Sequence, residues 1–407
     1  MFTPYRTILS LPGSLAFSAI GWYARLPMSM TGIGLVLLVS AVSGSYGLAG
    51  SVAAAFIVAQ AVTAPVQARL VDRFGQGRVI PPLALLNAVS MGGVIVAVQA
   101  GTGSPVPQLI AAVSGATSPL IGSFVRARWT HVLEGRPGLH TAFALEALID
   151  ELVFMIGPPL ITLLATSISP VAGLAAAVFA GLSGALLLAV QRRTEPPVHQ
   201  VRAGQGRKPA LGWPNLGPLV VASAGLGVLF GSAEVVVVAV ASEGGQRALS
   251  GVLLGVWATG SMLAALVIGT LRLRTPPHVR LRVSAAVLAV TLIPMPFIGH
   301  LGILGVVMFL AGFAISPTLV AVMAVIERTV PASRLTEGMA WTHTGVAAGV
   351  AAGAAIAGLV VDAAGGRAGF FVPLVAAVAT ALVTLAGRAP GPRVSSPEDA
   401  SLARSTA

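Results

Sequence analysis

The stretch ARLVDRFGQGR, residues 68–78, places four charged residues and two glycines between two long apolar runs. Residues 47–67 and 79–100, on either side of it, contain no charged residue. An α-helix needs about 20 mostly apolar residues to cross a hydrocarbon core of about 30 Å, and irregular backbone cannot face lipid at that depth. The pattern therefore predicts two membrane-spanning helices joined by a short charged turn.

The composition of the whole chain agrees with this interpretation. Only 9% of the 407 residues are charged, against about 25% in an average globular protein, and the mean hydropathy is +0.91. A net charge of +11 would suggest a nucleic-acid partner for a soluble protein, but the basic residues here are single or paired, without interleaved aromatic residues. We therefore expect a lipid bilayer, and no nucleic acid, as the surrounding partner. Cysteine is absent, which excludes disulfides and thiolate sites.

Twelve segments have the length and apolar character of a membrane span. The predicted spans are residues 12–38, 47–70, 79–100, 106–130, 141–166, 170–190, 214–241, 249–271, 281–299, 302–328, 338–361 and 368–387. The first contains Arg25 and Pro27 and has no clear small-residue cleavage site, so we interpret it as an uncleaved span rather than a secretory signal. The expected fold class is an all-α integral membrane protein of about 12 transmembrane helices.

Basic residues divide unevenly between the two sides of the membrane. If the N-terminus is cytoplasmic, every Arg and Lys except Arg25, Arg247 and Arg367 lies in or beside a cytoplasmic loop or terminus. This positive-inside pattern predicts that both termini are cytoplasmic. Lysine occurs once among the 24 basic residues and alanine is abundant, which is typical of a GC-rich genome and indicates a bacterial plasma (inner) membrane.

A long polar segment divides the spans six and six. Residues 191–213 contain proline, glycine and several charges, as a linker does. The fourth and tenth spans also echo each other, with GATSP at 115–119 and GFAISP at 312–317. We expect an N-terminal six-helix bundle, a cytoplasmic linker, a C-terminal six-helix bundle and a disordered tail: residues 1–190, 191–213, 214–390 and 391–407. Transporters built from two such halves bind substrate between them near the midplane.

The opening stretch carries a resemblance to a known family. Ala68-x-x-x-Asp72-Arg73-Phe74-Gly75, followed by Arg78, resembles the G-x-x-x-D-R-x-G-R-R signature between spans two and three of the major facilitator superfamily. The first glycine of the signature is Ala68 here, and Gln76 and Gly77 interrupt its final basic pair. The resemblance covers nearly the whole chain and implies a transporter of two six-helix bundles, similar to bacterial drug-efflux members.

In that family the loop acts as a conformational latch, which the resemblance assigns to Asp72, Arg73, Gly75 and Arg78. Gly75 permits a tight reversal, and Asp72 can accept hydrogen bonds from an exposed helix N-terminus, where the backbone dipole favours an anion. The expected partner is the start of the eleventh span near Gly338. The alternative is that these residues only mark a cytoplasmic turn and its positive charge.

Ionisable residues inside spans cost at least about 2.5–3.5 kcal/mol on insertion scales, so each is a candidate for function. Arg25, midway along the first span, must face a cavity or an acidic partner. It could bind an anionic substrate, modulate a carboxylate that carries a proton, or form a structural ion pair.

The fifth span contains three carboxylates. Glu146 and Asp150 are four residues apart and share a helix face, whereas Glu151 points about 100° away from Asp150. Arg126 and Arg128 end the fourth span at about the depth of Glu146, so an ion pair between one of them and Glu146 is expected. Asp150 and Glu151 are the deeper candidates for binding a proton or for pairing with Arg25.

Two further residues stand alone in the second half. Glu234, in the seventh span, is either a second proton-binding site or a residue that reaches the outer interface. His343, near the cytoplasmic start of the eleventh span, is either a hydrogen-bonded packing residue or a proton relay. We place both among the candidates for the substrate or proton cavity.

The expected function is secondary active transport by alternating access. No phosphate-binding Gly-x-x-x-x-Gly-Lys loop, HExxH, Gly-x-Ser-x-Gly or metal-ligand spacing occurs, so we expect neither an ATP-driven pump nor an enzyme, and no cofactor or metal. The leading hypothesis is proton-coupled efflux of an amphipathic or drug-like small molecule by a monomer. The alternatives are an importer or facilitator of a small anionic metabolite, and a membrane sensor or scaffold without transport.

Overall fold

The computed structural model describes residues 3–198, 213–270, 275–330 and 335–386, and the regular secondary structure within these ranges is all helical. Twelve helical segments of the described chain are long and apolar enough to cross a membrane. They agree with the twelve predicted spans to within a few residues at each end. The prediction of an all-α membrane protein with about 12 transmembrane helices is therefore confirmed.

The first six spans follow a short helix, α1. The fourth span is broken into α5 and α6 next to Pro119, which has no backbone N–H to continue the helix. A short 3-10 turn, η1, follows the sixth span. The elements are α1 Thr3–Leu9, α2 Ser14–Ser43, α3 Tyr46–Phe74, α4 Gln76–Gln99, α5 Val106–Thr117, α6 Ile121–Val132, α7 Leu139–Ser167, α8 Pro170–Val190 and η1 Arg192–Thr194.

The last six spans form a second group of helices. We call the group from α1 to α8 the first or N-terminal half and the group from α9 to α15 the second or C-terminal half. The ninth span includes the 3-10 turn η2, and the twelfth is divided into the short α14 and the longer α15. The elements are α9 Trp213–Glu243, α10 Leu249–Thr270, α11 Pro277–Leu292, η2 Met295–Phe297, α12 Leu301–Thr329, α13 Leu335–Ala364, α14 Gly366–Gly369 and α15 Phe371–Ala386. The middle of the predicted linker and the predicted disordered tail lie outside the described residues.

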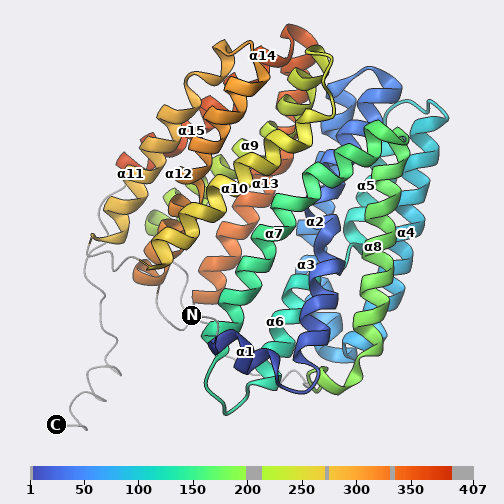
Figure 1. Ribbon diagram of the computed structural model, residues 1–407, viewed down its shortest axis with the longest axis vertical. Helices are drawn as coiled ribbons and strands as arrows, with labels where there is room; N and C mark the ends of the chain where they lie inside the picture. Colours follow the sequence, from blue (N-terminus) through green and yellow to red (C-terminus); the bar gives the residue numbers. More distant parts are fainter. Residues whose placement is uncertain (1–2, 199–212, 271–274, 331–334, 387–407) are drawn as a thin grey trace.

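Two helix pairs bring the groups together, α3 with α13 and α7 with α10 (Figure 1). Glycines allow the close approach: Gly50 of α3 lies against the backbone carbonyl of Ala354, and Gly251 of α10 lies against that of Pro158. A Cβ at either position would collide with backbone, so small residues are what let these helices pack in contact.

The helices have two distinguishable ends. The turn at Gly75, the turn near Arg136 and the segment after Val190 lie with α1 at one end, the lower end of Figure 1. We call it the basic end, because Arg73, Arg136 and Arg192 lie there. The turns after α2, α9 and α13 lie at the opposite end.

Candidate functional site

Arg25 of α2 lies at the centre of a buried charged cluster. Its side chain is only 2% exposed, and its Nη2 pairs with Glu146 Oε2 of α7. Its Nη1 lies 2.7 Å from Asp150 Oδ1, and its Nε donates a 3.0 Å hydrogen bond to the carbonyl of Gly21. Each nitrogen of the guanidinium therefore has a partner, which is how a charge is tolerated at this depth.

Asp150 connects this arginine to a second one. Its Oδ2 lies 2.6 Å from Nη2 of Arg126 on α6. Arg25, Arg126, Glu146 and Asp150 together form what we call the Arg25 cluster, with two positive and two negative charges. Asp150 is 23% exposed and Arg126 39%, whereas Glu146 is fully buried, so the cluster runs from the interior of the first half towards accessible space.

The prediction that Glu146 forms an ion pair with Arg126 or Arg128 was wrong. Glu146 contacts neither Arg126 nor Arg128; besides Arg25 it accepts a 2.7 Å hydrogen bond from Trp129 Nε1 and a 3.2 Å bond from Ser18 Oγ. The end of α6 does lie beside Glu146, as expected, but the α6 side chain that contacts Glu146 is Trp129. Arg126, three residues earlier, points to Asp150 instead.

Arg128 has a structural role in the first half. It is fully buried and donates hydrogen bonds to Gln76 Oε1 at 2.7 Å, to the Leu188 carbonyl at 2.8 Å and to the Gln191 carbonyl at 2.7 Å. These acceptors belong to the start of α4 and the end of α8. Arg128 therefore ties three helix ends together and does not point towards the other half.

The loop of the predicted latch, between α3 and α4, is hydrogen-bonded to the segment that follows α8. Gly75 has a left-handed φ of 85°, and the N–H of Gly77 donates a 2.8 Å hydrogen bond to Glu195 Oε1. Arg73 lies over the ring of Phe74, 5.1 Å from its centroid. The three charged members of the motif, Asp72, Arg73 and Arg78, are all exposed.

Asp72 makes no hydrogen bond or ion pair with any residue that the structure describes. The side chains near Gly338, its expected partner, lie outside the described part of the chain. The latch therefore stays a prediction.

At the opposite end, two polar contacts join the halves. The carboxylate of Asp362, at the end of α13, accepts hydrogen bonds of 2.7 Å from the backbone N–H groups of Tyr46 and Gly47, and one of 2.8 Å from Ser45 Oγ. Sequence reasoning missed Asp362. The available signal was a lone carboxylate at the end of a span, opposite a serine that begins another.

Arg247 makes the second contact. It lies in the turn between α9 and α10, and its Nη2 donates to the carbonyl of Leu37 at 2.9 Å and to Ser40 Oγ at 2.6 Å. Burial lowers the pKa of Arg247, but a guanidinium remains charged at neutral pH. The sequence identified this residue only as an exception to the charge asymmetry; in the structure it fastens the C-terminal half to the end of α2.

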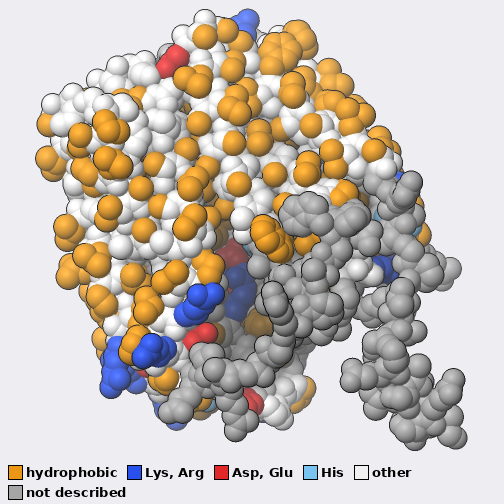
Figure 2. Space-filling model, turned by 180° about the vertical axis from the view of Figure 1, so that it is seen from behind, with side chains coloured by type: hydrophobic (Ala, Val, Ile, Leu, Met, Phe, Trp, Pro, Cys, Tyr) orange, Lys and Arg blue, Asp and Glu red, His pale blue; other side chains and the backbone are white. Residues whose placement is uncertain are grey.

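Towards the basic end the surface is hollowed, and acidic and basic side chains lie in the hollow (Figure 2). Glu151 of α7 is partly exposed and lies within hydrogen-bonding reach of Ser316 on α12, in the other half. His343 of α13 is exposed, and it lies close enough to Arg126 of the first half for their charges to interact. Glu151 and Ser316, and likewise Arg126 and His343, thus face each other from the two halves.

Glu234 of α9 differs from the other carboxylates. Its carboxylate lies against Gly32 of α2, where a Cβ would collide with Oε2, so the side chain points towards the first half and not along α9 to the outer interface. It is partly exposed and has no hydrogen bond or ion pair to any described residue. Like Glu151, it lies between the halves without an ion-pair partner among the described residues, but unlike Glu151 it has no hydroxyl within hydrogen-bonding reach.

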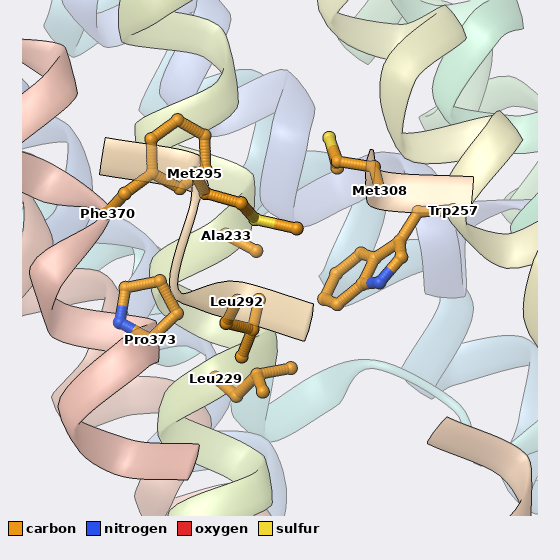
Figure 3. Close-up of a pocket in the computed structure, with 8 residues that line it drawn as sticks. All are labelled: Leu229, Ala233, Trp257, Leu292, Met295, Met308, Phe370 and Pro373. Atoms are coloured by element: carbon orange, nitrogen blue, oxygen red, sulfur yellow. The ribbon is translucent and has the colours of Figure 1, made fainter. Parts of the chain in front are cut away.

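A small cavity inside the second half is not a substrate site. Its volume is about 10 Å³, and its lining is apolar. Figure 3 shows the ring of Trp257 and the side chains of Leu292 and Met295 around the same space. A cavity of this size holds one water at most, and water needs polar partners, so we interpret it as a packing defect.

Comparison with known proteins gives a consistent family and fold. The sequence matches the Major Facilitator Superfamily over residues 16–316. None of the curated proteins matches this chain by sequence. Similar solved structures include the nucleoside transporter NupG, at 14% identity and a TM-score of 0.71, which covers 92% of this chain and 98% of its own.

Two further structures show the same likeness. A bacterial metal transporter has 16% identity and a TM-score of 0.63, with 91% of this chain and 97% of that chain covered. The human organic anion transporter MFSD10 has 15% identity and a TM-score of 0.59, with 94% and 99% covered. At these identities the likeness concerns the fold, and cargo differs from one structure to the next.

Proposed function

The chain belongs to the Major Facilitator Superfamily, and from this premise we propose that it is a secondary carrier that exports an amphipathic small molecule in exchange for protons. A family member moves small molecules across a membrane; the direction, the coupling ion and the class of cargo are the proposal. We further propose that the cargo carries a positive charge and that it and the proton compete for one carboxylate.

The position of Glu234 is the observation that carries this proposal. A carboxylate inside the membrane is stabilised either by protonation or by a cation, because a charge without a partner is costly there. The described neighbours of Glu234 supply no cation. A group of this kind binds a proton on one side of the membrane and exchanges it for a cationic cargo on the other, which is the minimum that antiport requires.

The Arg25 cluster argues against import of an anionic metabolite. That alternative gave Arg25 the role of binding the anion, but Glu146 and Asp150 already occupy its guanidinium. Recruiting Arg25 would require an anionic cargo to displace a buried carboxylate. Arg126 is more exposed, yet Asp150 is bound to it as well.

The contacts at the two ends support alternating access. Asp362 and Arg247 join the halves at the opposite end, while the basic end is hollowed. We propose that the basic end is cytoplasmic by the positive-inside rule, that the membrane is the bacterial inner membrane, and that a monomer works here in an inward-facing state. The latch of Asp72 would form when this end closes. A sensor or scaffold would have no need of the Glu234 carboxylate.

The test is proton movement in proteoliposomes that contain a pH dye. Lipophilic cations and small organic anions are added to wild type, to Glu234→Gln and to Glu134→Gln, a control at a carboxylate that is 83% exposed in a loop. We expect cation-dependent proton flux in wild type and in the control, and its loss in Glu234→Gln. Flux driven by anions and unaffected by Glu234→Gln would instead support the importer, and cation transport without protons would refute the coupling.

A further inference from the structure

A groove of about 350 Å³ lies on the outside of the C-terminal half, away from the space between the halves. It is formed by α11 and α12, which lie at the left of Figure 1, and by the end of α10. Its apolar lining includes Ile268, Val279, Val283, Val287, Phe313 and Val320. The volume lies at the lower end of the range for ligand sites, about 300–1,000 Å³.

The side chains of this groove face outward. Val283 is 58% exposed, Val320 is 45% exposed and Phe313 is 38% exposed. In a soluble protein such a patch would mark a protein partner, but these residues belong to spans of a membrane protein. The groove therefore opens to the acyl chains of the bilayer.

One end of the groove carries a positive charge. Arg280, in the first turn of α11, lines the groove at the basic end. Its Nε is buried without a hydrogen-bond partner, and no described residue forms an ion pair with it. Arg282, two residues later, differs: its Nε donates a 3.1 Å hydrogen bond to the carbonyl of Thr384 on α15. Only Arg280 of the two is directed into the groove.

The surroundings of Arg280 favour an anion. The first turn of α11 contains no acidic residue, and the N-terminal end of a helix is itself positive. A guanidinium in that turn is unfavourable with respect to the helix dipole, and its buried Nε lacks an acceptor. A ligand with a negatively charged oxygen would offset the unfavourable interaction with the helix dipole and would also supply the acceptor that Nε lacks.

We propose that this groove binds an anionic phospholipid of the cytoplasmic leaflet, with its phosphate at Arg280 and one acyl chain along α11 and α12. From Arg280 to Val287 the helix rises about 10 Å, so the groove holds the part of a chain that lies nearest the headgroup. Basic groups between helices on the cytoplasmic side are suited to anionic headgroups. Free phosphate shares the charge, but it would leave the adjoining apolar groove without an occupant.

Native mass spectrometry of the intact protein, released from detergent, tests this proposal. Dioleoyl phosphatidylglycerol and dioleoyl phosphatidylethanolamine are titrated separately into wild type, Arg280→Gln, Arg280→Lys and the control Arg69→Gln, an exposed arginine of α3. We expect wild type, Arg69→Gln and Arg280→Lys to prefer phosphatidylglycerol by about fivefold, the usual effect of one basic residue near a membrane surface. Arg280→Gln should lose that preference. If it keeps the preference, the proposal is wrong.

A second pair of variants tests the chain-binding part. Val283→Trp should fill the groove and remove one tightly bound lipid of either class, whereas Val290→Trp, at a 63% exposed position of the same helix outside the groove, should not. Equal lipid binding by both variants would overturn the proposal. Inorganic phosphate at millimolar concentration should not displace the lipid; displacement would show an anion site without a chain.

Discussion

Asp362 caps the first turn of α3 from the other half of the molecule: its Oδ1 accepts a 2.7 Å hydrogen bond from the backbone N–H of Tyr46. The first N–H groups of a helix have no partner within it, and the helix dipole favours an anion there. Ser45 caps α3 locally by accepting a 3.1 Å hydrogen bond from the N–H of Leu48, whereas the cap on Tyr46 comes from 316 residues away. Any separation of the halves at this end must therefore expose these N–H groups.

The same chemistry is predicted at the basic end with the roles exchanged. There Asp72, at the end of α3, is expected to cap the start of α13, while at the opposite end Asp362, at the end of α13, caps the start of α3. Two antiparallel neighbours would then cap each other, one end at a time. This arrangement leads to two predictions of opposite sign.

Removing the charge of Asp362 should open the opposite end. Hydrogen bonds to a charged group contribute about 1.5–3 kcal/mol, so Asp362→Asn should shift the balance of the two states roughly tenfold or more. The chain has no cysteine, so spin labels at Ala41→Cys and Ala363→Cys report the distance across this end without background labelling. A longer distance in Asp362→Asn is expected; an unchanged distribution would contradict the role of the cap.

Removing the charge of Asp72 should have the opposite effect. If Asp72 holds the basic end shut in the other state, Asp72→Asn destabilises that state and increases the population closed at the opposite end. The same label pair should then report a shorter or narrower distance, and transport should slow. Arg69→Gln, on the same helix, is the control. A shift in the same direction as Asp362→Asn would rule out alternating caps.

The glycines between α3 and α13 should be needed for closure. A Cβ on Gly50 would meet the backbone carbonyl of Ala354, so Gly50→Ala should keep the two helices apart at the opposite end and lengthen the label distance. Gly92→Ala on α4 is a matched control, because a Cβ there meets nothing within 4 Å and alanine favours a helix by up to about 1 kcal/mol. Equal label distances in Gly50→Ala and Gly92→Ala would show that the contact between Gly50 and the Ala354 carbonyl is not needed for closure.

The Arg25 cluster should contribute to stability more than to transport. Glu146→Gln removes a fully buried carboxylate and leaves Arg25 with part of its charge uncompensated, which typically costs about 3–5 kcal/mol. We expect a clear fall in the thermal unfolding midpoint in detergent. Ser18→Ala, which removes one 3.2 Å hydrogen bond to Glu146, should cost only about 0.5–1.5 kcal/mol.

A double substitution separates the charge from the packing. Arg25→Gln combined with Glu146→Gln removes both buried charges, so it should recover part of the stability lost in Glu146→Gln alone. If the double variant is less stable than wild type by the sum of the losses in Arg25→Gln and Glu146→Gln, the pair has no coupling and the cluster is not the reason for the burial of Arg25.

The twelve spans could be predicted from the sequence because membrane insertion depends on about 20 consecutive residues, whatever they later contact. Two features of the site were equally local. Glu146 and Asp150 share a helix face because of the 3.6-residue turn, and Asp72 precedes a glycine that reverses the chain. These properties need no knowledge of the neighbouring helices.

The partners of the charged residues were decided by tertiary structure alone. Hydropathy is nearly uniform around these helices, since lipid and protein neighbours are both apolar, so it does not show which face meets which helix. For this reason the sequence left Arg25 several possible roles and assigned Glu146 to the wrong arginine. The pairing of Arg25 with Glu146, the cap from Asp362 to Tyr46 and the place of Glu234 against Gly32 each join residues more than 100 positions apart. Such contacts depend on how whole helices rotate and pack, which no short segment encodes.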